Sequence, residues 1–304
     1  MRHTLPAATV LIPTRDRGDG VVATVRSVLA GGAAPAAVLV VDQSRDDATA
    51  LGLAALRADG RVRLLRTPTQ GLSIALNLGI ACAATECIAI TGDDCEVRPG
   101  WLDELVQALT ADANTGLVFG SVLPGRPDDP AGFTPAYAAR DVVARTVREK
   151  HLVSGTSACM ALRRSLWQRV GGFDELLGVG AALASAEDAD ITIRALLAGF
   201  AVRETSRAAV VHRGWYPYAE RRELIRRNWY GTGAAFAKAL RIGGLDAAIG
   251  LVRVGLTWVY AGSRVADGLG TGRYRRESLT ALLRGAWAGL RLPVERERGR
   301  FRPS

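Results

Sequence analysis

The stretch CIAITGDD, residues 87–94, decides the fold: a short apolar run ends in a glycine and two adjacent carboxylates. A run this short and this apolar is typical of a strand that is buried on both faces of a sheet. The chain around it repeats the pattern, because further apolar runs alternate with segments of helical periodicity. The expected strands are 8–13 (ATVLIP), 36–44 (AAVLVVDQS), 62–67 (VRLLRT), 87–94 and 116–123 (GLVFGSVL). The expected helices are 21–30, 46–58, 71–84 and 99–112.

Strands that alternate with helices at this spacing form βαβ units, which build a mostly parallel, Rossmann-like sheet flanked by helices. Ligands of such sheets bind outside the carboxyl ends of the strands. The polar residues at those ends are Thr14, Arg15, Asp16, Asp42, Gln43, Ser44, Asp93 and Asp94. We expect them to converge on one rim. No GxGxxG follows the first strand, so the dinucleotide-binding version of this fold is disfavoured.

The second half of the chain divides into an irregular insertion, a return to regular structure and a helical end. Residues 124–150 are rich in Pro and Gly and then in charged residues, which indicates a variable insertion. Regular elements resume with 151–175 (strand, helix, turn), 184–200 (helix) and 201–215 (one or two strands). We therefore expect an α/β domain over 1–216 and a helical C-terminal region over 217–304.

Charge, cysteine content and hydropathy indicate the kind of partner and the cellular compartment. The formal net charge is +9, with late arginine clusters such as 221–227. Such clusters either bind nucleic acid, anionic lipid or a phosphorylated substrate, or form a solvent-exposed surface without a ligand. Four cysteines without a CxxC pair, and no signal-peptide pattern, favour the cytoplasm. The apolar segment 245–263 carries Arg253 near its middle, so a packed or interfacial helix is favoured over a membrane span. Peripheral contact with the inner face of the cell membrane is therefore a further expectation.

The pair Asp93 and Asp94 is the first candidate for chemistry. Two carboxylates at a ligand-binding rim can hold Mn²⁺ or Mg²⁺, which favour oxygen ligands. A cation held there can stabilise an anionic phosphate leaving group. Turns also favour Asp, so this pair alone does not decide between a metal site and a turn.

Six segments, in chain order, carry a more specific pattern over roughly residues 8–215. They are VLIPTRDR, VVDQSRDD, TPTQGLSIALNLGIACA, ITGDDCEVRPGWL, SGTSACMALRRSLWQRVGGFDE and AEDADITIRALLAGF. In the same order they resemble the segments IPTYNR, VVDDGSxD, NxGxxxARNxG, TDDDCxPxPGWL, GxNxxxRRxxxxxVGGFDE and AEDxDLxxRLxxxG of the family 2 glycosyltransferases. Each match is loose alone, and the shared order carries the resemblance.

The resemblance implies a GT-A fold and an enzyme that moves a sugar from a nucleotide diphosphate, UDP by preference, to an acceptor hydroxyl. It implies inversion at the anomeric carbon and a divalent cation, Mn²⁺ or Mg²⁺. The acceptor would be a glycan, a lipid-linked acceptor or a small molecule such as a natural product. Nucleic acid is not expected as a partner.

The site residues follow from the same resemblance. Asp42 would hydrogen-bond the base and Asp93 would lie near the ribose, whereas Asp94 would ligate the metal. Asp188 would be the general base, with Glu187 beside it, and His212 would be a further metal or diphosphate contact. The remaining donor-binding candidates are Pro13, Thr14, Arg15, Ser44, Gly71 and Asn77.

Several of these residues keep a structural interpretation. Asp188 can instead cap the helix that follows it, because acidic residues favour that position. A lone histidine such as His212 is often structural, and Arg194 fits a solvated arginine. The glycines of GGFDE, residues 171–175, shape an acceptor pocket or end a helix.

The sequence also departs from the family. Gly92 stands where the first metal-segment aspartate is common, Leu76 replaces an arginine and Gln43 replaces an aspartate. These departures keep two other readings open. One is a nucleotidyltransferase with a related α/β core, although residues 13–20 lack its usual glycine-rich phosphate loop. The other is a non-catalytic, basic protein on a degenerate GT-A fold that binds a membrane or RNA.

Overall fold

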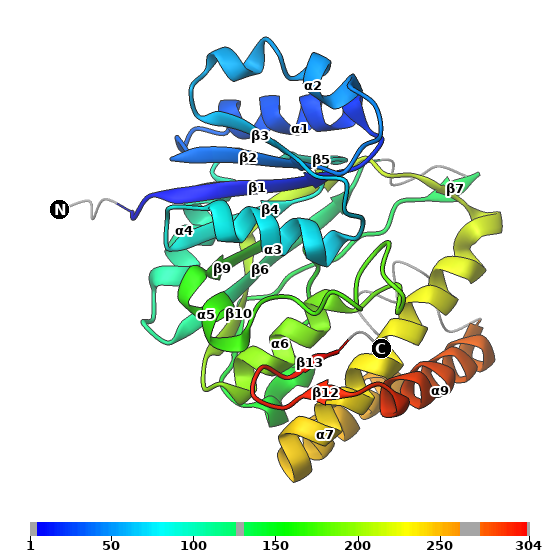
Figure 1. Cartoon of the computed structure of the whole chain (residues 1–304). Helices are drawn as coiled ribbons and strands as arrows, with labels where there is room; N and C mark the ends of the chain where they lie inside the picture. Colours follow the sequence, from blue (N-terminus) through cyan, green and yellow to red (C-terminus); the bar gives the residue numbers. More distant parts are fainter. Residues whose placement is uncertain (1–4, 126–130, 262–273, 303–304) are drawn as a thin grey trace.

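A nine-stranded sheet forms the centre of the protein (Figure 1). The structure is a computed structural model, and it describes residues 5–125, 131–261 and 274–302. The strands of the sheet are β1 (Ala8–Thr14), β2 (Ala37–Asp42), β3 (Val62–Arg66), β4 (Cys87–Thr91), β5 (Cys95–Val97), β6 (Thr115–Pro124), β8 (Val142–Ala144), β9 (Cys159–Arg163) and β10 (Ala201–His212). Their order is β3-β2-β1-β4-β9-β6-β10-β5, and β8 pairs with β10.

The strand register brings the predicted polar ends together. β1 pairs in parallel with β2 on one side and β4 on the other, and Thr14 lies opposite Asp42. The carboxyl ends of these three strands therefore share one rim. β9 runs antiparallel between β4 and β6, whereas β6 and β10 are parallel. The predicted α/β fold is confirmed.

Both faces of the sheet are buried, as the continuous apolar runs require. Val10 and Ile12 of β1 belong to one core cluster, and Leu11 between them belongs to the other. One layer contains α1 (Gly18–Ala30) and α4 (Trp101–Thr110), and the other contains α3 (Leu72–Cys82), α5 (Arg164–Val170) and α6 (Glu187–Leu197). The shorter elements outside the sheet are α2 (Ala48–Gly52), η1 (Leu56–Ala58), η2 (Val147–Leu152), η3 (Tyr218–Glu220), β7 (Gly132–Phe133) and β11 (Tyr216–Pro217).

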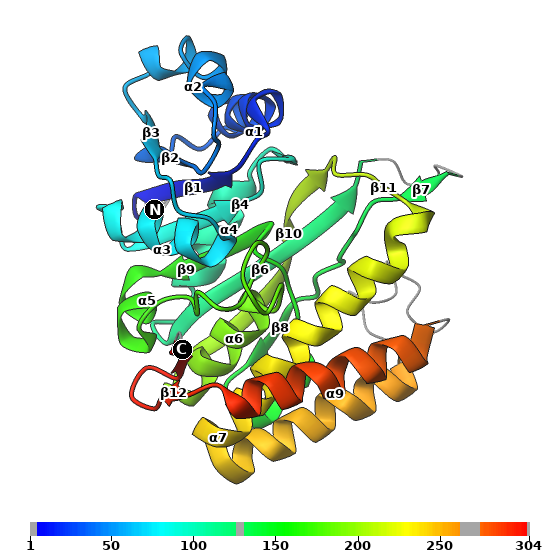
Figure 2. The ribbon, with the colours of Figure 1, turned by 45° about the vertical axis from the view of Figure 1, so that its right-hand side comes forward.

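Two long helices close one side of the molecule. α7 (Arg221–Ala261) bends at Gly244, and α9 (Arg275–Arg291) lies alongside it (Figures 1 and 2). Glycines permit this close approach, because a Cβ at Gly285 would stand 1.8 Å from the Tyr230 carbonyl oxygen. A Cβ at Gly233 would stand 2.0 Å from the Leu282 carbonyl oxygen. The hairpin of β12 (Val294–Glu295) and β13 (Arg300–Phe301) follows.

The observed elements differ from the predicted ones at two places. The single helix predicted over 46–58 is wrong, because α2 and η1 replace it. The strand predicted over 87–94 ends at Thr91, and Asp93 and Asp94 lie in a turn before β5. Of the predicted segments 124–150 and 245–263, residues 126–130 and 262–263 lie outside the described residues. Among the residues that the structure describes, no helix combines the length and apolar character that a membrane span requires.

Candidate active site

Asp93, Asp94 and the guanidinium of Arg17 lie together at the rim beyond β1 and β4. The Thr14 hydroxyl donates a 2.7 Å hydrogen bond to Asp93 Oδ2. Arg17 Nη1 lies 3.3 Å from Asp93 Oδ1 and also donates to Asp94 Oδ2. Sequence analysis missed Arg17, although its position three residues after Thr14 in TRDR was a signal for it. One arginine thus binds both carboxylates.

His212, from the end of β10, completes this cluster. Its Nε2 lies 3.3 Å from Asp94 Oδ2, and its Nδ1 is 3.1 Å from the Pro135 carbonyl oxygen. Donation from Nδ1 to that carbonyl orients the ring, so that Nε2 faces Asp94. Cys95, the first residue of β5, also approaches, with its Sγ 3.6 Å from Asp94 Oδ1. The ligand atoms of Asp94, Cys95 and His212 all lie within 4.8 Å of one another.

The cluster fits a divalent cation. Burial opposes ionisation of Asp94, but His212 and Arg17 outweigh it and hold the pKa of Asp94 well below its usual value. Burial and the charge of Asp94 raise the pKa of the Cys95 thiol, and hard cations such as Mg²⁺ and Mn²⁺ favour oxygen ligands over sulfur. The oxygen and nitrogen donors that remain suit Mn²⁺ or Mg²⁺. Room for an ion comes from Gly214, where a Cβ would stand 2.8 Å from both Asp94 Oδ2 and His212 Nε2.

Asp93 differs from Asp94 although the two are adjacent. Burial and the negative charge of Asp94 raise the pKa of Asp93, and the bonds from Thr14 and Arg17 offset this only in part. Asp93 is therefore the carboxyl of the pair that more readily holds a proton. Asp94 is the permanent anion.

The end of β2 forms a second part of the rim. Asp42 is fully buried, and its Oδ1 accepts a 2.9 Å hydrogen bond from the Ser44 backbone N–H. Its Oδ2 has no hydrogen-bond partner among the described residues, and Arg66 Nε is 3.7 Å away. The Ser44 hydroxyl accepts from the Asp16 N–H at 2.8 Å and so joins the two loops. An unsatisfied buried carboxylate oxygen at a strand end can accept a hydrogen bond from a ligand.

The other predicted donor-binding residues lie around these two parts. Pro13 pairs with Val41 within the sheet, and Arg15 Nε lies 3.4 Å from Asp16 Oδ2. Gly71 precedes α3 with φ of 122°, and its carbonyl accepts from the Gln43 side chain at 3.2 Å. That contact explains a role for glutamine at position 43, which sequence reasoning saw only as a departure.

Asn77 has well-defined partners within the protein. Its Nδ2 donates to the Phe173 carbonyl and to Glu175 Oε1, each at 3.0 Å. Its Oδ1 accepts from Trp167 Nε1 at 3.0 Å and from the Phe173 N–H at 2.8 Å. Asn77 therefore fixes the GGFDE segment against α3. In that segment Gly171 ends α5 with φ of 73°, which agrees with the helix-ending interpretation of the glycine pair.

Two carboxylates begin α6. The residue before the helix is Ala186, with φ of 73° and no side-chain cap, so neither Glu187 nor Asp188 is the N-cap residue. Glu187 Oε1 accepts a 3.1 Å hydrogen bond from the Ser157 hydroxyl. Burial raises the pKa of Asp188, and burial together with the charge of Asp188 raises the pKa of Glu187. Raised carboxyl pKa values are typical of general acid–base groups.

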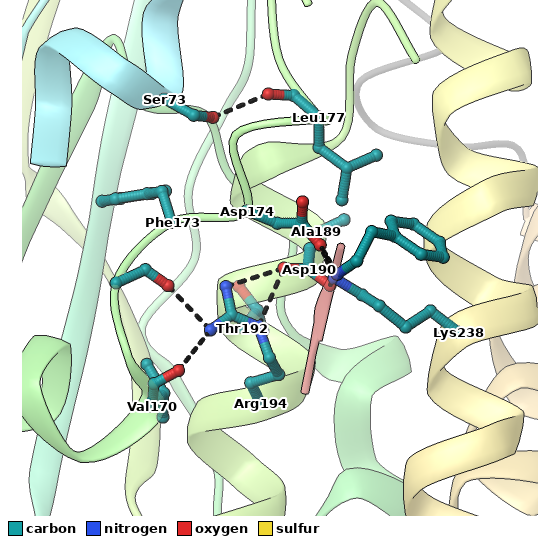
Figure 3. Close-up of polar contacts among 12 residues, drawn as sticks. Ser73, Val170, Phe173, Asp174, Leu177, Ala189, Asp190, Thr192, Arg194 and Lys238 are labelled. Atoms are coloured by element: carbon teal, nitrogen blue, oxygen red, sulfur yellow. Dashed lines mark hydrogen bonds and ion pairs between the residues drawn. The ribbon is translucent and has the colours of Figure 1, made fainter. Parts of the chain in front are cut away.

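A charge network lies one turn further along α6 (Figure 3). Asp190 Oδ1 is 2.8 Å from Lys238 Nζ of α7, and Asp190 Oδ2 accepts a 2.8 Å bond from Arg194 Nε. Lys238 also pairs with Asp174 of GGFDE, whose Oδ2 accepts from the Phe301 N–H at 2.7 Å. The expectation that Arg194 is solvated is therefore wrong: its side chain is 3% exposed. Sequence reasoning missed Lys238 because a lysine on a helix is usually solvated.

Comparison with known proteins agrees with the family resemblance of the sequence. The family model described as glycosyl transferase family 2 matches residues 9–171, which is more than half of the chain. The chain belongs to this family, and so to a class of enzymes that transfer sugars. The pre-mycofactocin glycosyltransferase of Mycobacterium tuberculosis is 28% identical over 247 residues, 75% of this chain and 46% of that protein. The chain thus spans about half the length of this curated relative.

Solved structures share the fold across nearly the whole chain. The mannosyltransferase PcManGT from Pyrobaculum calidifontis, in complex with GDP-Man and Mn²⁺, matches with a TM-score of 0.64 at 19% identity, over 95% of this chain and 88% of that one. TarS 1–349 of S. aureus, in complex with UDP-GlcNAc, matches with a TM-score of 0.59 at 16% identity, over 92% and 81%. The predicted GT-A fold with a helical C-terminal extension is confirmed.

Proposed function

We propose that this chain transfers a sugar from a nucleotide diphosphate to an acceptor hydroxyl, with a divalent cation and with inversion at the anomeric carbon. The observation that carries the proposal is the cluster of Asp94, His212 and Asp93 at the rim of β1 and β4. Solved relatives with the same fold hold GDP-Man with Mn²⁺, or UDP-GlcNAc. Between these nucleotides, UDP is our proposal because VVDQS resembles the family's uracil-reading segment.

The donor would bind across the rim. Asp42 Oδ2, which has no hydrogen-bond partner among the described residues, would accept a hydrogen bond from the base. Asp93, held by Thr14, would accept from the ribose, and Asp94 with His212 would hold the cation. The cation supplies positive charge against the diphosphate as it leaves. Arg17 places a second positive charge at the same spot.

Asp188 would act on the acceptor. Direct displacement requires a carboxylate that takes the hydroxyl proton while the new bond forms. The raised pKa of Asp188 makes it a stronger base than an ordinary aspartate, and Glu187 holds its own proton to higher pH. Glu187 would therefore position the site, and the negative charge would rest on Asp188.

The test is calorimetric titration of UDP, dTDP and GDP, with and without Mn²⁺. We expect one nucleotide to bind in a metal-dependent manner, and Asp94→Ala to weaken that binding at least about 100-fold through loss of a charged ligand. Asp103→Ala is the matched control, because Asp103 is an exposed carboxylate on α4. Metal-independent binding that is equal in all three proteins would contradict the proposal.

We also propose that residues 217–304 provide the acceptor or membrane side of the enzyme and residues 1–216 the donor side. Four residues on one face of α9 support membrane contact: Leu279, Leu283, Trp287 and Leu290 are 51–63% exposed. The guanidinium of Arg291 lies over the Trp287 ring, 5.7 Å from its centroid, which places a cation at the edge of this face. Amphipathic helices of this kind lie in membrane interfaces.

Vesicle flotation tests this contact. The double variant Leu283→Ser/Trp287→Ser should lose binding to vesicles with phosphatidylglycerol. Leu51→Ser, which alters a 74% exposed leucine on α2, should keep it. Equal flotation of both variants would show that α9 does not face the membrane.

A further inference from the structure

An open cavity of about 960 Å³ lies between α7, α9 and the segment 178–186 that precedes α6. α9 packs against the first half of α7 at Gly285 and Gly233, and Gly231 of α7 packs against Ser185 in the loop before α6. Figure 2 shows α7 and α9 side by side. Five arginines line it: Arg222, Arg226 and Arg227 of α7, with Arg276 and Arg284 of α9. Among the described residues that line it, Glu223 and Glu277 are the acidic ones. The cavity thus carries more positive than negative charge.

Part of this positive charge is uncompensated. Arg222 Nη2 lies 3.0 Å from Glu277 Oε1, and Arg226 Nη1 lies 3.1 Å from Glu223 Oε2. Arg227, Arg276 and Arg284 have no acidic partner within 4.0 Å among the described residues. Like charges gathered in a concave surface repel one another, so an anion that enters gains from all of them.

The walls of the cavity are rigid and leave space at its centre. Gly285 and Gly233 pack α9 and α7 backbone to backbone, which fixes the arginines of one helix relative to those of the other. The lining includes alanines, whose short side chains do not fill the space, namely Ala182, Ala184, Ala219 and Ala281. A preformed site loses little freedom when it binds, and arginine forks match phosphate oxygens in geometry.

The position of the cavity ties it to the acceptor side of the reaction. Ala182 and Ala184 line it, and Glu187 and Asp188 follow Ala184 by three and four residues. α7 presses on the same segment, since a Cβ at Gly231 would stand 2.5 Å from the Ser185 carbonyl oxygen. An anionic group held here would belong to a molecule that extends toward Asp188. The diphosphate of the donor has its own proposed site, at the cation held by Asp94 and at Arg17.

We propose that this cavity binds a phosphate or diphosphate group of the acceptor, so that the acceptor class is a phosphorylated glycan or lipid. The proposal rests on the proposed function for its meaning as an acceptor site. Its anion binding is independent of that function and can be measured alone. Arg227 and Arg284, one from each helix, supply the uncompensated charge.

The experiment is calorimetric titration of inorganic pyrophosphate into the full chain in EDTA, so that no metal holds pyrophosphate at the donor site. The variant Arg227→Gln/Arg284→Gln is compared with Arg26→Gln/Arg57→Gln, which removes the same charge from exposed positions on α1 and η1. We expect the Kd of pyrophosphate to rise about tenfold or more in the first variant through loss of charged hydrogen bonds, and to stay unchanged in the second. The wild-type Kd should also rise with salt.

Two further arms identify the source of the phosphate. If the same variant loses flotation with phosphatidylglycerol vesicles but not with phosphatidylcholine vesicles, the cavity takes a lipid-borne phosphate. If only pyrophosphate binding is lost, it takes a phosphate on a soluble acceptor. Absence of pyrophosphate binding, or equal affinity in both variants, would overturn the proposal. Nucleotide titration with Mn²⁺ should be equal in both variants, and its failure in the wild type would count against the proposed function alone.

Discussion

Three acidic residues of α6 lie within one turn and meet opposite environments. Asp190 contacts Lys238 and Arg194, which outweigh its burial and hold its pKa below the usual value. For Glu187 and Asp188, at the start of the same helix, burial raises the pKa values, and for Asp188 the charge of Lys150 offsets this only in part. The difference is compensation: one carboxylate is paired for stability, and the other two remain poised to exchange a proton. One end of the helix is therefore fixed by ion pairs, whereas its first turn carries the carboxylates that we propose for catalysis.

The largest expected effect is a loss of stability when the ion pairs of Asp190 and Asp174 with Lys238 are broken. Lys238→Met leaves Asp174 without its lysine and Asp190 with Arg194 alone, in a fully buried setting. Removal of one partner of a buried ion pair costs about 3–5 kcal/mol. Denaturant unfolding should show a loss of this size. The double variant Lys238→Met/Asp174→Asn should recover part of it, and a single variant within about 1 kcal/mol of the wild type would contradict the account.

Removal of the charge of Asp188, in the first turn of α6, should instead raise the stability, and by a smaller amount. A carboxyl whose pKa is raised in the folded state holds extra protons there, so its contribution to stability falls as pH rises from near 4 through that raised value. Asp188→Asn should therefore stabilise the protein at pH 8 by up to about 3 kcal/mol, because the pKa of Asp188 is raised from 3.8 to about 6, and should leave it unchanged at pH 4. Thermal unfolding at both values measures this.

The control for that experiment is Glu297→Gln, which alters an exposed carboxylate in a turn and should change neither melting temperature. Asp188→Asn that destabilises the protein at pH 8 would show that Asp188 serves the fold and not the chemistry. Acid should act on Asp190 in the reverse sense: its stabilising charge is present above the unfolded pKa and is lost as pH falls through its lowered folded pKa.

The smallest expected effect is on the affinity of the proposed metal site for Mn²⁺. Arg17 already neutralises Asp93 and Asp94, and an incoming Mn²⁺ meets its repulsion. Arg17→Gln should tighten binding of Mn²⁺ alone roughly 30-fold, because a divalent and a monovalent charge about 4 Å apart in water interact by about 2 kcal/mol. Titration followed by electron paramagnetic resonance measures this, with Arg26→Gln as control. A weaker site in Arg17→Gln would show that Arg17 organises the ligands instead of competing with the metal.

The comparison also separates what the sequence predicts from what it conceals. The apolar runs, the rim residues Thr14, Asp42 and Asp93, and the acidic start of α6 were all predictable, because periodicity and chain order carry that information. The partners of these residues were not, since Arg17 and Lys238 reach them from other elements through the tertiary fold. Arg194 shows the limit plainly, because only packing buries it.

One measurement tests the central claim most directly: hydrolysis of the bound donor, followed as nucleotide release from pH 5 to 9. The wild-type rate should rise with pH through the raised pKa of Asp188. Asp188→Asn should be slower by about 100-fold or more and lack this rise, while its nucleotide affinity stays at the wild-type value. If Asp188→Asn retains the wild-type rate and pH profile, the uncompensated carboxylates of α6 are not the catalytic ones.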